Sequence, residues 1–447
     1  MAREKQEKKT KESMEKIKGF ISIQEALDKK KGKVSLHGWV HREAKMKDKI
    51  FLVLRDSSNI IQCVIKQDMV SKGQWQALQK VLVESSMEIE GTIKEDKRSP
   101  TGYEVEVSSL KVIGYAEPYP ITKEINEELL LDRRHLWLRS RKMTAIMKIR
   151  STVLEAIHEF YHARGFYEYQ SPIFQAVQCE GGSTLFEVKY FDTKTYLAQT
   201  WQLYAEPAIF ALEKIYTIAP TFRAEESKTS RHLTEFWMHE MEVAWASFKD
   251  IQDYGESLIK HIVKRVLEKN KQDLEILNRD VKKLEPTLKK PFPRMTYDEA
   301  IKLLEKKGLK IAWGKDLRTP EEDKISELYD VPIIISNYPK EVKAFYMRED
   351  EKNPKVVHGF DCIAPEHFGE IIGGSEREPD LEKLKKRLKE MGEKIEKYSF
   401  YLDTRRYGSV PHGGFGMGVE RLLAWICGLE SIKDTISFPR TINRATP

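Results

Sequence analysis

Cysteine is scarce in this sequence, and long apolar runs are absent. Its 447 residues include only four cysteines, which are Cys63, Cys179, Cys362 and Cys427. Since none forms a Cys-x-x-Cys pair, the spacing excludes a disulfide framework and a cysteine-rich zinc site. No apolar run approaches the roughly 18 residues that a membrane span needs, and the charged start does not resemble a signal peptide. We therefore expect no membrane association and a reducing compartment, the cytoplasm.

One phosphate-binding signature is missing, and one zinc-binding signature is present. The loop Gly-x-x-x-x-Gly-Lys-Ser/Thr does not occur, which excludes nucleotide binding of the P-loop type. The segment His158-Glu-Phe-Tyr-His162 matches the His-Glu-x-x-His pattern of zinc proteases on an expected helix. The apolar stripe of this helix passes through Ile157 and Phe160, and no further ligand is evident nearby. Because short patterns also arise by chance, we interpret this one as a chance match.

Charge is unevenly distributed along the chain. The whole sequence has a net charge of +6, but residues 1–50 hold 15 basic and 8 acidic residues, which leaves the rest near neutral at −1. A basic end attracts polyanions, with nucleic acid the usual candidate. A solvated, lysine-rich tail has the same composition and is the alternative. Residues 1–18 are mostly charged and polar, so we expect a charged N-terminal extension.

Five short, partly alternating runs of β-branched residues predict a small β-barrel. The runs cover residues 33–40, 50–55, 59–66, 87–93 and 103–107. Turn signals separate them, and a helix-like segment lies between the third and fourth runs. This order is typical of an OB-fold, whose face binds single-stranded nucleic acids or sugars. We expect residues 19–118 to form this domain.

Three side chains of the expected barrel are candidates for contact with nucleic acid. Phe51 offers a ring for base stacking. Arg42 and Gln62 offer contacts to phosphate and to base edges. A lone aromatic residue in a strand is more often part of a core, so burial of Phe51 inside the barrel is the alternative interpretation.

A larger domain is expected at residues 141–447, after a linker at 119–140. Its expected elements are a helix over 143–164, two strands over 214–225 and 235–245, a helical insertion at about 250–340, and a glycine-rich strand end at 413–418 that leads into a helix. Together with the barrel, these elements predict an α+β protein.

Arginines and carboxylates concentrate at three places in this larger domain. The first is Phe222-Arg-Ala-Glu225 with the following Arg231 and His232, the second is Gly416-Met-Gly-Val-Glu-Arg421, and the third is Asp361 with Glu370 and Arg377. Arginine clamps phosphate, glycine lets a ligand approach the backbone, and paired acids suit Mg²⁺. Surface ion pairs would explain each place singly, but their coincidence favours a nucleotide site.

These segments resemble the three signature motifs of class II aminoacyl-tRNA synthetases. Pro172 after the long helix is similar to motif 1, and the segments around Arg223 and Arg421 are similar to motifs 2 and 3. The two signatures of the other synthetase class, His-Ile-Gly-His and Lys-Met-Ser-Lys-Ser, are missing. The resemblance covers about residues 20–447. It implies an OB-fold that reads the anticodon, an antiparallel catalytic sheet flanked by helices, and a homodimer formed through motif 1.

Within this class the chain resembles the aspartyl/asparaginyl subgroup, and its asparaginyl branch most. The segments that carry this likeness are 180–186, 202–206, 369–375 and 405–412. Aspartyl enzymes have a lysine where this chain has Ala205, and that lysine pairs with the substrate's β-carboxylate. Here Arg377 can meet an amide oxygen, and Glu206 can accept from the amide nitrogen directly or through water. Aspartate would instead bring two carboxylates together.

The resemblance also implies roles for the remaining site residues. They are Glu180, Thr200, Gln202 and Glu240 for the α-amino group, Arg223 for the carboxylate and α-phosphate, Glu225, Arg231, His232, Leu233, Phe236, Glu370, Gly418 and Arg421 for ATP, and Asp361 with Glu370 for Mg²⁺. Two positions depart from the family pattern. Trp201 stands where a small residue is usual and Glu376 where glutamine is frequent, which affects the expected size and charge of the pocket.

The implied reaction has two steps. The asparagine carboxylate attacks the α-phosphorus of ATP, giving an adenylate and pyrophosphate, and the 3′-terminal ribose of tRNA(Asn) then takes the acyl group. Such a site needs alignment and charge neutralisation, with Arg223 and Arg421 as its catalytic arginines. Three alternatives stay open: a discriminating or non-discriminating aspartate-tRNA ligase, an ammonia-dependent asparagine synthetase, which would lack the OB-fold, and a catalytically inactive tRNA-binding paralogue, against which the intact arginines argue.

Overall fold

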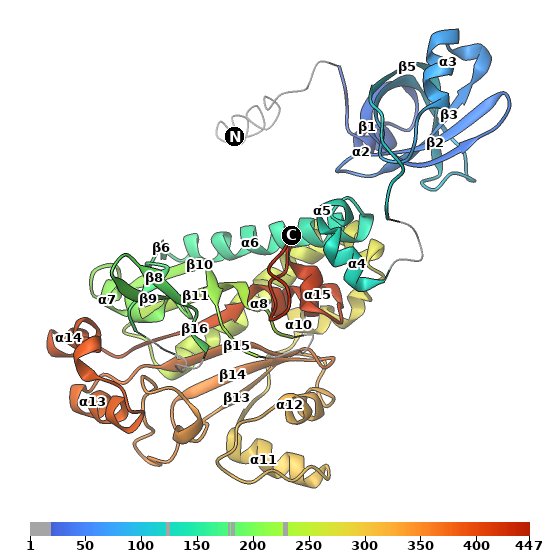
Figure 1. Ribbon diagram of the computed structural model, residues 1–447. Helices are drawn as coiled ribbons and strands as arrows, with labels where there is room; N and C mark the ends of the chain where they lie inside the picture. The colour runs from blue at the N-terminus through green and yellow to red at the C-terminus, as the bar shows by residue number, and fades with distance from the viewer. Residues whose placement is uncertain (1–18, 122–125, 178, 180–183, 227–230) are drawn as a thin grey trace, which may run out of the picture. The chain divides into compact units, whose positions relative to one another are not determined.

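The computed structural model describes residues 19–121, 126–177, 179, 184–226 and 231–447. The chain divides into two compact units, with the boundary between Leu130 and Leu131 (Figure 1). This boundary falls inside the linker expected at 119–140. Among the described helices, none has both the length and the apolar character that crossing a bilayer requires.

The first unit is a closed five-stranded barrel in the strand order β1-β2-β3-β5-β4. Its elements are α2 (Ile23–Lys29), β1 (Gly32–Lys45), β2 (Lys49–Arg55), β3 (Ile60–Lys66), η1 (Gln67–Met69), α3 (Lys72–Gln79), β4 (Ser86–Glu95) and β5 (Tyr103–Gly114). Alternation builds the core, since Ile50, Leu52 and Leu54 of β2 are fully buried. Ser71 caps α3 in a capping box with Gln74. The predicted barrel, with its helix after the third strand, is confirmed.

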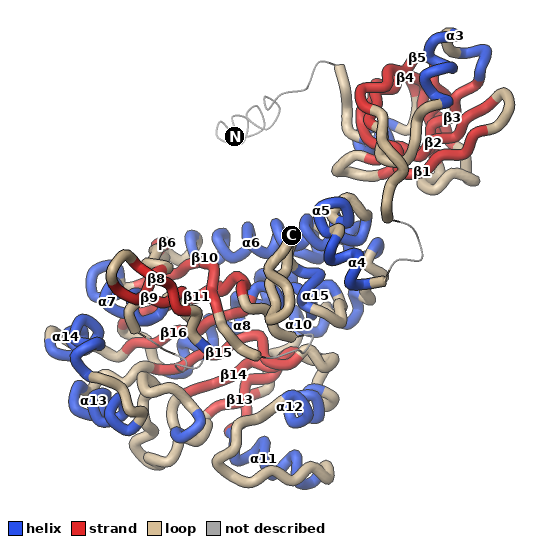
Figure 2. Tube along the Cα trace, viewed as in Figure 1, coloured by secondary structure: helices blue, strands red, loops and turns tan. Residues whose placement is uncertain are grey.

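The second unit is built on an eight-stranded, mostly antiparallel sheet in the order β12-β13-β14-β15-β16-β11-β10-β6. Its strands are β6 (Tyr167–Glu168), β10 (Lys214–Phe222), β11 (Glu235–Ala244), β12 (Arg294–Thr296), β13 (Ile333–Ser336), β14 (Gly359–Ala364), β15 (Gly369–Glu376) and β16 (His412–Gly418). A separate three-stranded sheet consists of β7 (Phe174–Gln175), β8 (Glu187–Tyr190) and β9 (Thr193–Leu197). The expected antiparallel catalytic sheet is therefore present (Figure 2).

Helices surround this sheet. They are α4 (Glu127–Asp132), α5 (Arg134–Trp137), α6 (Arg141–His162), α7 (Gln202–Leu212), α8 (Phe248–Lys269), α9 (Lys271–Ile276), α10 (Glu285–Lys289), α11 (Tyr297–Lys306), α12 (Thr319–Ser326), α13 (Leu381–Glu390), α14 (Ser399–Arg406) and α15 (Val419–Cys427), with 3₁₀ turns η3 (Val281–Lys283), η4 (Lys340–Val342), η5 (Ile395–Tyr398) and η6 (Ile432–Thr435). The segment expected as a helical insertion also supplies β12 and β13 to the sheet edge, which corrects that part of the prediction.

The largest apolar core lies between the sheet and helices α6, α8 and α15 (Figure 1). The stripe expected on α6 is buried there, with Ile149, Val153 and Ile157 fully inaccessible. Side chains of β11 and β16, such as Met241 and Phe415, complete this core from the sheet. The helices pack against one face of the sheet. The cavity described below is lined by strands of the same sheet.

Candidate functional site

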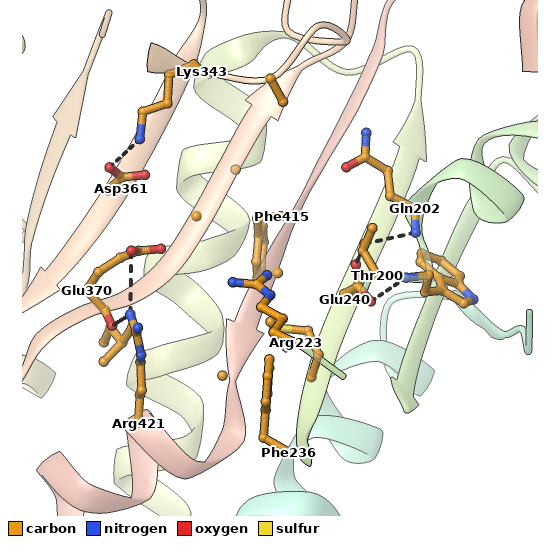
Figure 3. A pocket seen from close by; sticks show the side chains of 18 of the residues that line it. Thr200, Gln202, Arg223, Phe236, Glu240, Lys343, Asp361, Glu370, Phe415 and Arg421 are labelled. Carbon is orange, nitrogen blue, oxygen red and sulfur yellow. Dashed lines mark hydrogen bonds and ion pairs between the residues drawn. The ribbon is translucent and has the colours of Figure 1, made fainter. Parts of the chain in front are cut away.

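A cavity of about 320 Å³ lies over strands β11, β14, β15 and β16 and the start of α15 (Figure 3). Part of its floor is bare backbone, because Gly373, Gly374 and Gly416 line it. At Gly374 no side chain fits, since a Cβ would lie 2.6 Å from carbon atoms of Phe360 and Phe415. Glycine at 374 therefore keeps the strands packed against the core. Glycine at 373, where a Cβ would point toward the Glu370 and Asp361 carboxylates, lets a ligand lie directly against the sheet.

At one end of the cavity, Glu240 of β11 is held by the segment before α7. Its carboxylate accepts hydrogen bonds from the Thr200 hydroxyl and, at 2.8 Å, from the backbone N–H of Trp201 (Figure 3). Burial raises the pKa of Glu240 to about 7, although these hydrogen bonds oppose the shift. A buried carboxylate of this kind is suited to accept an α-ammonium group. Gln202 follows in the chain and also lines the cavity.

The bulk of Trp201 does not reduce the cavity. Its indole N–H donates to the carbonyl oxygen of Tyr169 at 2.8 Å, and its ring packs in a separate cluster with Ala205 and Ile209. The side chain is 2% exposed. The departure from a small residue is therefore accommodated behind the site, while the backbone of Trp201 serves Glu240.

Arg377 and Glu242 form a bidentate ion pair deeper in the same cavity. Arg377 Nε and Nη2 donate to the two oxygens of Glu242, each at 2.9 Å. Arg377 Nη1 also donates to Ser375 Oγ at 2.6 Å, and the guanidinium lies 5.0 Å from the ring centroid of Tyr346. Burial raises the pKa of Glu242, and the Arg377 charge opposes that shift. The pair presents an arginine and an acid side by side to any group that enters.

Glu206, which the sequence analysis assigned to the substrate amide, does not line the cavity. The residue is fully buried behind the cavity lining, and its closest approach to Arg377 is 3.9 Å. Its partners are Gln202 Nε2 at 2.9 Å, the Tyr401 hydroxyl at 2.8 Å, Arg405 Nη1 at 2.6 Å and His412 Nε2 at 3.1 Å. Burial opposes ionisation, but Arg405, His412 and Arg377 more than offset it and lower the pKa of Glu206.

The acid that faces the cavity beside Arg377 is Glu242. Contact of Glu206 with the substrate amide, directly or through water, stays a prediction. The signal for Glu242 was present in the sequence. It lies two residues after Glu240, and alternate residues of a strand share one face. Glu206 instead supports the buried arginines from behind.

Glu376 is turned away from the cavity. Its carboxylate pairs with the Arg348 guanidinium and with His358 Nδ1, the latter at 2.8 Å. These hydrogen bonds outweigh burial and lower the pKa of Glu376, and Glu376 and Asp350 together raise the pKa of His358. The acid that replaces the family's frequent glutamine is thus neutralised locally and adds no charge to the pocket.

Arginines line the other end of the cavity. Arg223, just after β10, has its guanidinium 5.5 Å from the ring centroid of Phe236 on β11 (Figure 3). The hairpin register brings them together, because Thr221 pairs with Phe236. Arg421 lies in the first turn of α15 and donates to the carbonyl oxygen of Glu370 at 3.1 Å. An aromatic face and two guanidinium groups that line the same cavity suit a purine with phosphates.

The remaining residues predicted for ATP are brought to the same cavity. Its lining includes Glu225, Arg231, His232, Leu233, Glu370 and Gly418. Arg231 is paired with Asp323 of α12 at 3.0 Å and donates to the carbonyl of His367. The insertion therefore reaches the site through Asp323, a contact for which the sequence offered no signal.

Asp361 of β14 and Glu370 of β15 extend over the same glycine. A Cβ on Gly373 would lie 3.0 Å from Glu370 Oε1 and 3.7 Å from Asp361 Oδ1. Lys343 Nζ pairs with Asp361 Oδ2 at 2.8 Å (Figure 3). Burial and the nearby Glu370 carboxylate raise the pKa of Asp361 to about 6, against the effect of Lys343. Two acids in this arrangement fit a hard divalent cation, and Lys343 is a site residue that sequence reasoning missed.

The candidate residues of the first unit share the outer face of its barrel. Val53 pairs with Arg42 on one side and with Gln62 on the other, and Phe51 lies two residues away on the same face. Arg42 is exposed and Phe51 is half-buried, so the alternative that Phe51 belongs to the core is wrong. Gln62 Nε2 donates to Glu104 at 3.0 Å.

One remaining candidate for the amino-acid site, Glu180, lies outside the described residues.

Comparisons with known proteins agree with this geometry. The family model of class II tRNA synthetases (D, K and N) matches residues 126–442, and that of the OB-fold nucleic acid binding domain matches residues 34–113. An asparagine-tRNA ligase of Thermococcus kodakarensis is 48% identical over 415 residues, 93% of this chain and 96% of the relative. One of Lactobacillus gasseri is 46% identical over 429 residues, 96% of this chain and 99% of the relative.

A solved structure supports the same family assignment. The asparaginyl-tRNA synthetase from Pyrococcus horikoshii, complexed with asparaginyl-adenylate, superimposes with a TM-score of 0.93 at 45% identity. The match covers 96% of this chain and 100% of that one. The two domains, the cavity and the relatives lead to one conclusion: the chain belongs to the class II tRNA synthetases of the D, K and N group.

Proposed function

We propose that this chain activates L-asparagine with ATP and transfers the asparaginyl group to the 3′ end of tRNA(Asn). The observation that carries the proposal is the Arg377–Glu242 pair inside the cavity. A carboxamide has an oxygen that accepts from a guanidinium and a nitrogen that donates to a carboxylate. An asparagine side chain is therefore complementary to both members of the pair at once.

Aspartate is a poorer fit to the same cavity. Its second carboxylate oxygen would face Glu242, and like charges in a buried site are costly. Ala205 is fully buried and offers no cation to separate the two acids. The relatives named asparagine-tRNA ligase and the similar structure with asparaginyl-adenylate support asparagine as the substrate, rather than aspartate.

Different cavity residues serve different parts of the first step, which is adenylate formation. Glu240, held by Thr200, accepts from the α-ammonium group and fixes the amino acid. Arg223 lies beside the Phe236 ring and its charge acts on Glu240, so we assign it to the attacking carboxylate and to the α-phosphate of an ATP whose adenine stacks on Phe236. Arg231, His232 and Arg421 line the region where the outer phosphates would lie. The site thus aligns the reactants and neutralises charge, which is what adenylate formation requires.

We infer that Asp361 and Glu370 would hold Mg²⁺ in this site. The two carboxylates lie over one glycine, and burial together with the Glu370 carboxylate raises the pKa of Asp361 to about 6, against the effect of Lys343. When bound, Mg²⁺ supplies Lewis-acid neutralisation of the ATP phosphates. Lys343 compensates Asp361 with its own charge.

We further propose a cytoplasmic homodimer formed through α6 and the residues that follow it. The family resemblance at Pro172 supports the dimer. The four cysteines are buried and none forms a disulfide, which agrees with a reducing compartment.

Charging of tRNA(Asn) tests the proposed function. The full-length chain, incubated with ATP, Mg²⁺ and labelled asparagine, is expected to acylate a tRNA(Asn) transcript and to leave tRNA(Asp) uncharged. Charging with labelled aspartate alone would establish the aspartate alternative. Failure with both amino acids would establish the inactive tRNA-binding paralogue.

Substitution of Phe51, on the outer face of the barrel, is expected to weaken tRNA recognition without affecting catalysis. Phe51→Ala should lower kcat/KM for tRNA charging by about 5- to 150-fold, because stacking on one base contributes about 1–3 kcal/mol. Pyrophosphate exchange, which needs no tRNA contact at the barrel, should stay unchanged. Ile113→Ala, at an exposed apolar position on β5, is the matched control and should change neither rate. Unchanged charging by Phe51→Ala would refute a stacking role.

A further inference from the structure

Outside the catalytic cavity, two imidazoles and a carboxylate converge where α6 ends. His158 and His162 lie one helical turn apart on α6, and Glu168 lies on β6. One donor atom from each of the three lies within 4.8 Å of the others. His158 Nδ1 is 3.8 Å from a Glu168 carboxylate oxygen. This cluster contains the two histidines of the His-Glu-x-x-His segment, together with a third donor that the sequence analysis did not recognise.

The chain reversal after α6 brings Glu168 to the two histidines. Gly165 has φ +73°, a left-handed conformation that ends the helix and turns the chain back. The short strand β6 then pairs in parallel with β10, which sets Glu168 beside Tyr216. The third donor therefore comes from six residues after the motif, close in sequence but on a different element.

We propose that His158, His162 and Glu168 form a binding site for a divalent transition metal, with Zn²⁺ as the ion that fits best. Two imidazoles and one carboxylate are a common protein ligand set for zinc, leaving a fourth position for water. Nitrogen donors favour such an ion over Mg²⁺, which prefers oxygen. In the single chain the three residues are at least partly exposed, and His158 and Glu168 line a second cavity of about 470 Å³ that shares no residue with the catalytic one.

The proposed site is not hydrolytic. In zinc proteases the glutamate of the motif activates a water molecule. Here Glu159 forms a bidentate pair with Arg265 of α8, at 2.8 and 3.0 Å, and belongs to the helix–helix contact. A metal held by the three donors would instead tie the end of α6 to β6.

The Tyr216 hydroxyl would have different roles in a metal site and in a cluster that is held by hydrogen bonds alone. Its hydroxyl lies 2.8 Å from His158 Nδ1 and 3.0 Å from His162 Nε2 and so bridges the two rings. A metal would take over this bridge and make the hydroxyl dispensable. If the cluster exists only for hydrogen bonding, the hydroxyl is instead its central member.

Metal titration of the untagged, full-length chain tests the proposal. After chelator treatment and removal of the chelator, isothermal titration with Zn²⁺ should show one site per chain, and zinc should raise the melting temperature. His158→Ala, His162→Ala and Glu168→Ala should each weaken binding by at least about tenfold, since even indirect support of a ligand is worth that much. His135→Ala, an exposed histidine of α5, is the control and should bind zinc as the natural chain does.

Tyr216→Phe gives the deciding comparison, because it removes the hydroxyl and keeps the buried ring. Retained zinc binding in this variant, with loss in the histidine variants, supports the site. Absence of stoichiometric binding by the natural chain overturns the proposal. Equal binding by the natural chain and Glu168→Ala also overturns it, and this surface variant stays informative even where a histidine variant folds poorly.

Discussion

Arg223→Ala is expected to lower asparagine-dependent ATP–pyrophosphate exchange by about 1,000-fold or more, while the fold is retained. Donors aimed at charge that develops in a transition state contribute on the order of 10²–10³ in rate, and arginines in phosphoryl transfer contribute up to about 10⁵. Arg223 lies at the end of β10 against the Phe236 ring, so its loss removes the cation from the centre of the cavity. Exchange rates at saturating ATP, together with a thermal unfolding curve, measure both quantities.

Arg164 offers a matched control for this substitution. Its guanidinium also lies over a phenylalanine ring, 3.7 Å from the centroid of Phe160, but at the end of α6 and outside the cavity. Arg164→Ala should therefore leave exchange within a few-fold of the natural rate. Near-normal exchange by Arg223→Ala would contradict the assigned role, and equal losses in both variants would indicate a general effect of arginine removal.

Glu242→Gln is expected to reduce the preference for asparagine over aspartate by about 100-fold. The substitution keeps the shape of the side chain but replaces its charge, so an aspartate carboxylate would meet an amide and the Arg377 guanidinium instead of an acid. Differences of this kind in buried polar sites are worth about 1–3 kcal/mol per unsatisfied group. The ratio of kcat/KM values for the two amino acids in pyrophosphate exchange measures the change.

Glu240→Gln is the control, because it lies two residues away on the same strand and faces the same cavity. It is expected to contact the α-amino group that both amino acids share. Its substitution should therefore slow both reactions alike and leave the ratio nearly unchanged. If Glu240→Gln changed the ratio and Glu242→Gln did not, the assignment of the two acids would be reversed.

The fold was predictable where a local pattern repeats. Alternating apolar residues determine the barrel strands, and the 3.6-residue stripe through Ile149, Val153 and Ile157 determines the buried face of α6. The strands β12 and β13 have three and four residues. Runs this short within a charged helical segment have no periodicity of their own. Only pairing within the sheet, of β13 with β14 and of β12 with β13, makes them strands.

The site was predictable where its residues lie in contiguous motifs, and less so where contacts join distant segments. Glu206 follows Ala205 in the chain, but its carboxylate is committed to Tyr401, Arg405 and His412, about 200 residues away. Nothing in the local sequence reveals those partners. Glu242 was detectable from strand alternation, and its pairing with Arg377 again depends on the sheet order.

Relative activation of the two amino acids by the natural chain tests the central claim most directly. Pyrophosphate exchange with asparagine and with aspartate, each over a range of concentrations, gives both kcat/KM values. The Arg377–Glu242 pair predicts that asparagine is preferred by about 10⁴-fold, the scale seen when a site built for one polar group is offered another. Equal values, or a preference for aspartate, would contradict the account of the pair as a carboxamide site.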